Sequence, residues 1–282
     1  MICYLCGSNS HKTRQGKVRD NPSLPIYECN NCSLVFLPSD KHLPVDFYEQ
    51  SGMHDKQVDI DKWLTETEDD DSRRYKVLHQ LIENKSLLDV GCGNGGFLLK
   101  AAKKTSLTMG VELEINARDY HQKKNLHTVE SINHLSTNDR FDFITLFHVL
   151  EHIADPINFL NQLKQHLTPG GKIIIEVPNS ADALLTLYES QEFSNFTYWS
   201  CHLFLYNGQT LAKLFNNCGF KISYIKQIQR YPLANHLYWL SKKSPGGHKH
   251  FHFLNSPGLN QAYEEQLAAL GICDTIFSSI NL

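Results

Sequence analysis

Residues 86–102 read SLLDVGCGNGGFLLKAA, and this stretch decides the fold. The apolar run around Asp89 predicts a buried strand, the glycines at 91, 93, 95 and 96 predict a tight turn, and FLLKAA predicts a helix. A strand, a glycine-rich turn and a helix in this order are typical of cofactor-binding loops, although a glycine loop alone is weak evidence.

Glu112 strengthens this interpretation. It lies 23 residues after Asp89, at the end of the next expected strand. A carboxylate in that position can accept hydrogen bonds from both hydroxyls of a ribose. The alternative is a solvated charge at a strand end, and Glu112 taken alone does not exclude it.

The chain beyond this stretch alternates short β-rich runs with helical patterns, which predicts a parallel sheet with crossover helices. We expect strands at residues 107–113, 127–130, 141–147, 172–179 and 221–229 and helices at 97–104, 115–124 and 210–220. Residues 148–167 are expected to form a helix with a break at Asp155-Pro156. The run DTIFSSI, residues 274–280, could supply a final edge strand.

Length and composition set limits on the function. A chain of 282 residues allows one large domain with a small appendage. It is 41% hydrophobic and 20% charged, with a net charge of −3, which is ordinary for a globular protein and does not favour a nucleic-acid partner. We find neither a signal-peptide pattern nor a stretch of about 18 apolar residues, so we expect a cytoplasmic protein with no membrane partner.

We expect the chain to be organised as a small module at 1–38, a helical lead-in or lid at 39–85 and the main domain at 86–282. The aromatic-rich segment 180–208 and the segment 230–271 interrupt the alternation of strands and helices. Long segments that follow strand ends are where α/β proteins build their substrate sites.

Cys3, Cys6, Cys29 and Cys32 form two C-x-x-C pairs separated by 22 residues, close to the spacing of four-cysteine zinc ribbons. A redox-active pair is the alternative, but such a pair normally precedes a helix, and here a strand-like run follows. A module of about 38 residues cannot be stable by core burial alone, so a structural Zn²⁺ fits best. Four thiolates would leave that zinc no open position for catalysis.

The sequence resembles the class I S-adenosylmethionine-dependent methyltransferases over roughly residues 72–229. The motifs that carry this resemblance are DVGCGNGG (89–96), GVELEIN (110–116), FDFITLFHVLEHIADP (141–156) and LTPGGKIIIEVPN (167–179). It implies a Rossmann-like, seven-stranded, mostly parallel sheet with helices on both faces, next to the zinc ribbon. A nicotinamide enzyme is the rival at the level of the fold, but G-x-G-x-x-G is only partly met and HVLEH and LTPGG have no role in it.

The resemblance also implies which residues contact S-adenosyl-L-methionine. They are Asp89, Gly91, Cys92, Gly93, Gly95, Glu112, Ile132, Phe147 and His148.

His148, Glu151 and His152 formally match the H-x-x-E-H metalloprotease pattern, since positions i, i+3 and i+4 share one face of a helix. We reject that interpretation because only three residues match and they follow the fourth strand of a methyltransferase pattern. Similar enzymes, including ubiquinone O-methyltransferases, place two acids and a histidine here as a divalent-metal site. His148 replaces the first acid, so we prefer Glu151 and His152 as residues that orient the cofactor pocket, and we leave a second metal open.

His202 is the expected general base, since the resemblance places a histidine before the helix that leads into strand six. A histidine with a pKa near 6.5 can remove a proton from an acceptor hydroxyl. The alternative is a histidine that only packs among the aromatic residues. His148 is the second catalytic candidate. His248, His250 and His252 lack an acidic or cysteine partner nearby, so we assign them to a solvated or substrate-facing loop.

The first 38 residues resemble the zinc ribbon of some methyltransferases that act on sugars, and residues 229–253 resemble surface-polysaccharide methyltransferases. These resemblances imply O-methylation of a small polar intermediate, such as a nucleotide sugar or a surface-glycan precursor. We keep two alternatives. One is an O- or C-methyltransferase for a quinone or another small molecule, and the other is a non-catalytic cofactor-binding module that docks a partner protein through its ribbon.

Overall fold

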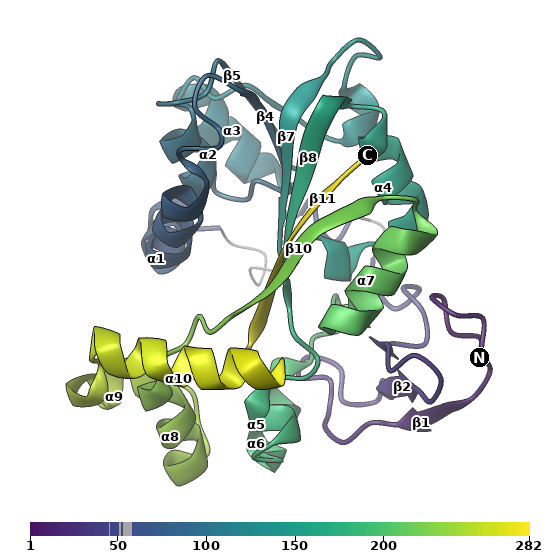
Figure 1. Cartoon of the computed structure of the whole chain (residues 1–282), viewed down its shortest axis with the longest axis vertical. Helices are drawn as coiled ribbons and strands as arrows, with labels where there is room; N and C mark the ends of the chain where they lie inside the picture. The colour runs from purple at the N-terminus through teal and green to yellow at the C-terminus, as the bar shows by residue number, and fades with distance from the viewer. Residues whose placement is uncertain (45, 51, 53–57) are drawn as a thin grey trace.

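The computed structural model describes residues 1–44, 46–50, 52 and 58–282. Within these residues the central sheet has seven strands, in the order β10 (Lys221–Ile228), β11 (Thr275–Asn281), β8 (Leu167–Pro178), β7 (Phe141–Phe147), β4 (Ser86–Val90), β5 (Leu107–Val111) and β6 (Thr128–Val129). The strands from β8 to β6 are parallel, and β11 runs antiparallel to both of its neighbours (Figure 1). This confirms the expected mostly parallel sheet.

The last strand, β11, is not at the edge of the sheet as the sequence suggested. It pairs with β10 on one side and with β8 on the other, and six of its seven residues are buried. Ser278 and Ser279 are buried with them, at 0% and 1% exposure. Because two serines lie inside this short run, the sequence suggested an edge strand. Whether these serines are buried depends on which strands pair with β11.

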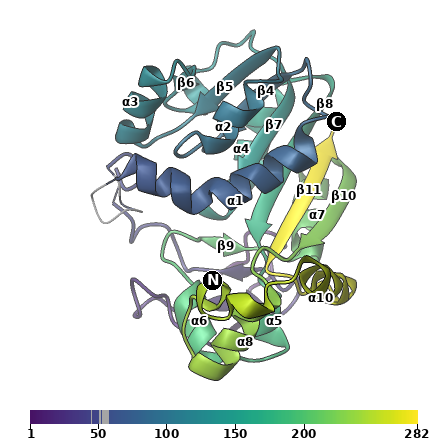
Figure 2. The ribbon, with the colours of Figure 1, turned by 90° about the vertical axis from the view of Figure 1, so that its left-hand side faces the viewer.

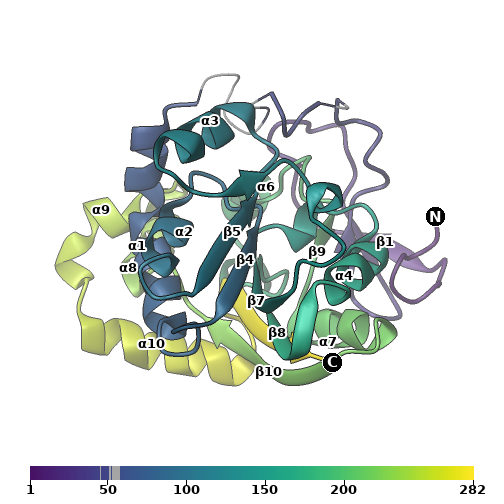
Figure 3. The same ribbon diagram turned by 90° about the horizontal axis from the view of Figure 1, so that it is seen from above.

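Helices cover both faces of the sheet. Figures 1 and 3 show α1 (Ile60–Leu78) and α2 (Gly96–Ala101) on one side and α4 (Pro156–Lys164) and α7 (Gly208–Asn217) on the other. Figure 1 shows α3 (Ile115–Lys123) on the side of α2. Successive side chains of a strand point to opposite faces, and the two cores follow this rule.

In β4, Leu87 belongs to the core that includes Leu78 of α1 and Phe97 of α2. The next residue, Leu88, belongs to the core that includes Leu160 of α4 and Leu214 of α7. The buried run SLLDV therefore fixes the position of Asp89 at the strand end, between two packed layers.

Helix α1 begins at the cap Asp59, whose side chain accepts a hydrogen bond from the backbone N–H of Lys62. Figure 2 shows α1 running across the strands of the sheet. Its buried residues include the charged Asp71 and Arg74, so this helix presents ionised groups as well as apolar ones to the main domain.

The N-terminal residues form a second sheet, with the order β1 (His11–Thr13), β2 (Tyr27–Cys29), β3 (Val35–Phe36) and β9 (Phe204–Leu205). Strand β9 comes from the segment 180–208 and pairs antiparallel with β3. The backbone N–H of Leu37 also donates to the carbonyl of Leu203, at 3.0 Å. The ribbon is thus joined to the main domain by strand pairing as well as by the chain.

The segment 230–271 is mostly helical, and the segment 180–208 contains two short helices and β9. Their elements are α5 (Ala183–Thr186), α6 (Gln191–Thr197), α8 (Leu233–Lys242), α9 (Gly247–His250), η4 (His252–Leu254) and α10 (Pro257–Leu270). Short 3₁₀ turns also occur at η2 (Ile132–His134) and η3 (Leu150–His152). Within the described ranges, none of the helices combines the length and the apolar character that crossing a bilayer requires.

Candidate active site

The turn between β4 and α2 depends on its glycines. Gly91 has φ +69°, and a Cβ added there would lie 2.5 Å from the side chain of Val149. The backbone N–H groups of Gly91 and Cys92 both donate to the carbonyl of Val111, at 2.8 and 3.1 Å. The turn is therefore held against the end of β5, where Glu112 follows.

A cavity of ≈ 560 Å³ opens beside this turn. Its size lies within the usual range of small-molecule sites. Its wall includes eight of the nine residues expected to contact the cofactor, namely Asp89, Gly91, Cys92, Gly93, Glu112, Ile132, Phe147 and His148.

Gly95 is the ninth expected cofactor residue, and it is not among the residues that line the cavity. It caps α2 with φ +80°, and a Cβ added there would lie 2.8 Å from Nε2 of His121. In this structure Gly95 shapes the turn and leaves room for His121.

Glu112 accepts hydrogen bonds through both oxygens. Its Oε2 accepts from the backbone N–H of Gly93 at 2.6 Å, and its Oε1 accepts from that of Glu114 at 2.9 Å. Burial raises the pKa of Glu112. Two backbone donors fix the carboxylate at the cavity wall, and each oxygen keeps a second lone pair for a ribose hydroxyl.

Asp89 stands at the end of β4 and is buried. The hydroxyl of Thr145 donates to it at 2.6 Å. Burial raises the pKa of Asp89 to about 7. The carboxyl group therefore exchanges its proton near neutral pH, and a cationic ligand in the cavity would favour its ionised form.

The wall also contains residues that the sequence patterns did not single out. Trp63, Asp70 and Arg74 come from α1, and Arg230 follows β10. Trp63 lies over Gly93, where an added Cβ would be 2.9 Å from its ring. In the sequence, the only sign of these cavity residues was the acidic run at 66–71, which is followed by two arginines. This run lies in the segment that we expected to act as a lid.

Ion pairs connect α1 to the far side of the cavity. Glu176, near the end of β8, is fully buried and lies 2.7 Å from Nη2 of Arg74 and 2.9 Å from Nη1 of Arg73. Asp70 pairs with Arg73 at 3.0 Å and also with Arg230. Asp70, Arg74 and Arg230 line the cavity, whereas Arg73 and Glu176 are not among the residues that line it.

His148 follows β7 with φ +56° and is surrounded by charged groups. Its Nδ1 lies 3.2 Å from a carboxylate oxygen of Glu151. Its Nε2 lies 3.0 Å from Nη1 of Arg230 and 3.3 Å from a carboxylate oxygen of Glu176. A guanidinium can only donate, so neutral His148 accepts from Arg230, whereas protonated His148 can donate to both carboxylates.

The expected helical face of His148, Glu151 and His152 is not formed, because η3 is a single 3₁₀ turn and His148 precedes it. His152 also lines the cavity, but its hydrogen-bond partners differ from those of His148. Its Nδ1 is 2.9 Å from the carbonyl of Cys201 and 3.3 Å from the hydroxyl of Tyr48. The positive φ of His148 and the tight turn separate the side chains of His148 and His152, which a regular helix would place on one face.

His202 packs edge-on against His152, with ring centroids 4.8 Å apart, and it is not among the residues that line the cavity. Burial, together with the neighbouring His152, lowers the pKa of His202 to about 3. A histidine with that pKa holds a proton poorly at neutral pH. The role of His202 as the base stays a prediction. His148, which lines the cavity, is the better supported candidate.

The ribbon cysteines meet at one point. Their four Sγ atoms lie within 4.8 Å of one another, with Cys3 to Cys32 at 3.6 Å and Cys6 to Cys29 at 3.5 Å. A tetrahedral zinc with bonds of about 2.3 Å needs sulfur atoms about 3.8 Å apart, so the geometry fits this ion. All eight cysteines of the chain lie in its described part, and they are free thiols there.

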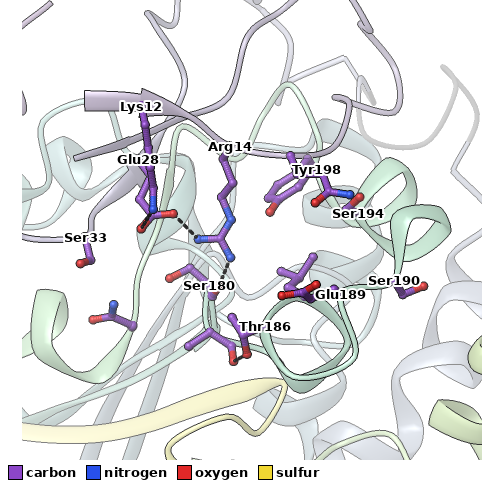
Figure 4. A pocket seen from close by; sticks show the side chains of 14 residues that line it. Lys12, Arg14, Glu28, Ser33, Ser180, Thr186, Glu189, Ser190, Ser194 and Tyr198 are labelled. Carbon is purple, nitrogen blue, oxygen red and sulfur yellow. Dashed lines mark hydrogen bonds and ion pairs between the residues drawn. The ribbon is translucent and has the colours of Figure 1, made fainter. Parts of the chain in front are cut away.

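A second cavity, of ≈ 430 Å³, lies between the ribbon and the helices α5 and α6. Figure 4 shows Arg14 between Glu28 and Ser180, and its guanidinium donates to the Glu28 carboxylate at 3.3 Å and to the carbonyl of Ser180. These contacts cross from the ribbon to the segment after β8. The cavity is bordered by this bridge and does not include the cofactor loop.

His248, His250 and His252 lie in and after α9 and do not gather around a common point. Among the described residues, the groups of histidine, cysteine and acidic side chains that could hold a metal are the ribbon cysteines and a cluster of His152, Cys201 and His202.

Comparison with known proteins supports the fold. A family model described as a methyltransferase domain matches residues 66–225, more than half of the chain. A solved structure of a SAM-dependent methyltransferase from Archaeoglobus fulgidus superposes with a TM-score of 0.51 at 18% identity, covering 79% of this chain and 94% of that one. This likeness shows a shared fold.

Two curated relatives are similar over part of the chain. A ubiquinone biosynthesis O-methyltransferase from Hydrogenovibrio crunogenus is 28% identical over 134 residues, which is 44% of this chain and 56% of that protein. A protein of the same name from Coxiella burnetii is 33% identical over 117 residues, 38% of this chain and 50% of that protein. The chain spans about half the length of these relatives.

Proposed function

The chain belongs to the methyltransferase-domain family, and from this premise we propose that it transfers a methyl group from S-adenosylmethionine to an oxygen of a small acceptor. The observation that carries this proposal is the cavity in which the glycine turn, Glu112 and His148 meet. The cofactor supplies a methyl group that its sulfonium already activates. The chain must then hold the acceptor oxygen close to that methyl and in line with it.

At the cofactor end, Glu112 would hold the ribose and the turn at 91–93 would approach the cofactor with its backbone. Both features are rigid before binding, since two backbone N–H groups hold the Glu112 carboxylate. Arg74 brings a positive charge to the wall, and Glu176 pairs with it and with Arg73.

At the acceptor end, His148 is our first candidate for the proton acceptor. In the neutral ring Nδ1–H donates to Glu151 at 3.2 Å and Nε2 accepts from Arg230 at 3.0 Å, so a proton taken up at Nε2 would replace the bond from Arg230 with a contact to Glu176 at 3.3 Å. Both carboxylates are fully buried. His202 is the second candidate, acting from behind His152.

For the acceptor, we propose a small polar intermediate such as a nucleotide sugar or a surface-glycan precursor. The support is the ion pair of Asp70 and Arg230 in the cavity wall, which suits a substrate rich in hydrogen-bonding groups. A phenolic quinone precursor is the second candidate, because the relatives described above are named ubiquinone biosynthesis O-methyltransferases.

We propose a structural zinc in the ribbon, held by Cys3, Cys6, Cys29 and Cys32. The support is the distances between the four sulfur atoms. A closed shell of four thiolates holds the ribbon strands together and offers no site for an acceptor.

The test is to incubate the full chain with isotopically labelled S-adenosylmethionine and a panel of nucleotide sugars, glycan precursors and catechols, followed by mass spectrometry of the products. Calorimetry measures cofactor affinity in parallel. A methylated sugar supports the first acceptor class, and a methylated catechol supports the second. Cofactor binding without transfer to any acceptor favours the non-catalytic alternative, and absence of cofactor binding overturns the proposal.

Two variants separate the candidate bases. We expect His148→Ala to lower turnover by roughly 10²–10⁴-fold while cofactor affinity changes little. His202→Ala is measured beside it, and His127→Ala, on the exposed surface, is the matched control. If His202→Ala alone abolishes turnover with affinity intact, the role passes to His202. If neither variant matters, positioning alone accounts for catalysis.

A further inference from the structure

We propose that His152, Cys201 and His202 form a second metal site, selective for a zinc-like divalent cation. One ligand atom from each side chain lies within 4.8 Å of the others. This bound is compatible with a shared ion, since ligands at about 2.0–2.3 Å from a common ion lie roughly 3.3–3.8 Å apart.

His152 is already oriented as a ligand. Its Nδ1 lies 2.9 Å from the backbone carbonyl of Cys201, so Nδ1–H donates and Nε2 keeps its lone pair. Metal-bound histidines commonly donate their other ring N–H to a carbonyl in this way, which fixes the tautomer and the ring orientation. The hydroxyl of Tyr48, 3.3 Å from Nδ1, adds a second contact on the same side of the ring.

His202 supplies an unpaired nitrogen. Its Nδ1 is buried and has no hydrogen-bond partner among the residues that the structure describes. Its ring lies edge-on to that of His152, with centroids 4.8 Å apart. A buried polar atom without a partner is rare in native proteins, and a missing ion is one of its ordinary explanations.

Glu151 provides a second, independent observation. This residue, which precedes His152 in the chain, is fully buried. Within the described part of the chain its Oε2 has no hydrogen-bond partner, although Oε1 contacts His148. A buried carboxylate next to the cluster favours a cation there. Glu151 itself is not one of the three ligands.

The chemistry of the ligands selects the metal. Two imidazoles and one thiolate suit zinc or cobalt, whereas magnesium and calcium prefer oxygen ligands. Three protein ligands leave a fourth position open, as in catalytic zinc sites. His152 lines the large cavity, so the fourth position could take an acceptor hydroxyl. This role rests on the proposed function, whereas metal binding does not.

The experiment compares the zinc content of the full wild-type chain with that of Cys201→Ala and His202→Ala, after dialysis against buffered zinc. We expect about two zinc ions per wild-type chain, one in the ribbon and one here, and one in each variant. Cys218→Ala, at a buried cysteine outside both clusters, is the matched control and should keep two. Cobalt substitution gives a second readout, because its thiolate charge-transfer absorption reports how many sulfur atoms bind.

One zinc ion in the wild-type chain overturns the proposal, and so does an unchanged zinc content in both variants. Circular dichroism and the cobalt spectrum of the ribbon show whether each variant is folded, and His202→Gln replaces His202→Ala if that chain unfolds. None of these readouts needs turnover. A chain that binds two zinc ions but transfers no methyl group would refute the proposed function and leave the metal site standing.

Discussion

Glu112 is the single side chain whose removal tests the cofactor site most directly. Glu112→Ala deletes the carboxylate that we expect to accept from both ribose hydroxyls. Loss of such charge-assisted bonds should weaken cofactor binding by roughly 1.5–3 kcal/mol, measured by calorimetry. Glu130→Gln removes an exposed carboxylate that pairs with Arg118, at 3.8 Å, and should leave affinity unchanged. Equal affinities for wild type and Glu112→Ala would refute the placement.

Asp182 makes stability depend on pH. Burial, with a contribution from Asp274, raises its pKa to about 8, while an unfolded aspartate titrates near 3.9. Between these values the folded state holds a proton that the unfolded state has lost, so this residue favours folding at low pH and the benefit disappears as pH rises toward 8. Asp182→Asn should keep the cap on Leu184 N–H and flatten the fall in unfolding free energy between pH 5 and 8. Urea titrations with the same slope against pH in both proteins would contradict this.

Residues that belong to a motif were predictable, and residues brought in by tertiary packing were not. Glu112 follows from a strand end, and the cysteine pairs follow from their spacing. Arg230 lies 82 positions after His148, and their contact arises only once β10 and β7 belong to the same folded sheet. The turn at His148 was not predicted either, because the order of apolar and polar residues in HVLEH is as compatible with a helix as with a turn.

At the scale of secondary structure, helix α1 covers one side of the cavity, and a residue from the C-terminal half of the chain holds it in place. Asp70 of α1 pairs with Arg230, and both are about one-fifth exposed. Arg230→Gln leaves Asp70 without this partner, which should weaken cofactor binding by about 1–3 kcal/mol and speed hydrogen exchange in residues 60–78. Lys226→Gln, an exposed position on β10, serves as the control. Unchanged exchange in α1 would show that the ion pair does not hold it.

The strands were predictable as elements, but their order was not. Periodicity identifies a buried run, and it does not say which neighbour pairs with it. This is why β11 was expected at an edge and why the two-residue strand β9 was not expected at all. The seven-stranded sheet could be expected because four motifs occur in a known order, which is information beyond local pattern.

For the whole molecule, the ribbon and the main domain should unfold together. Cys6→Ser removes one of the four clustered sulfur atoms that we propose to hold zinc. A loss of even 2 kcal/mol lowers the melting temperature of a domain of 150–250 residues by about 4–8 °C. We expect a shift of that size or larger in calorimetry, in a single transition. Two separate transitions, with the main one unmoved, would show that the ribbon is independent.

Strand β9 also governs how the chain behaves when it is cut. Phe204 and Leu205 are 8% and 4% exposed because β3 and the ribbon cover them. In a fragment that begins at residue 39, their backbone N–H and C=O groups would face water beside two bare apolar side chains. Such an edge pairs readily with other chains. The ribbon therefore protects the protein against aggregation, and its loss would appear first as reduced solubility.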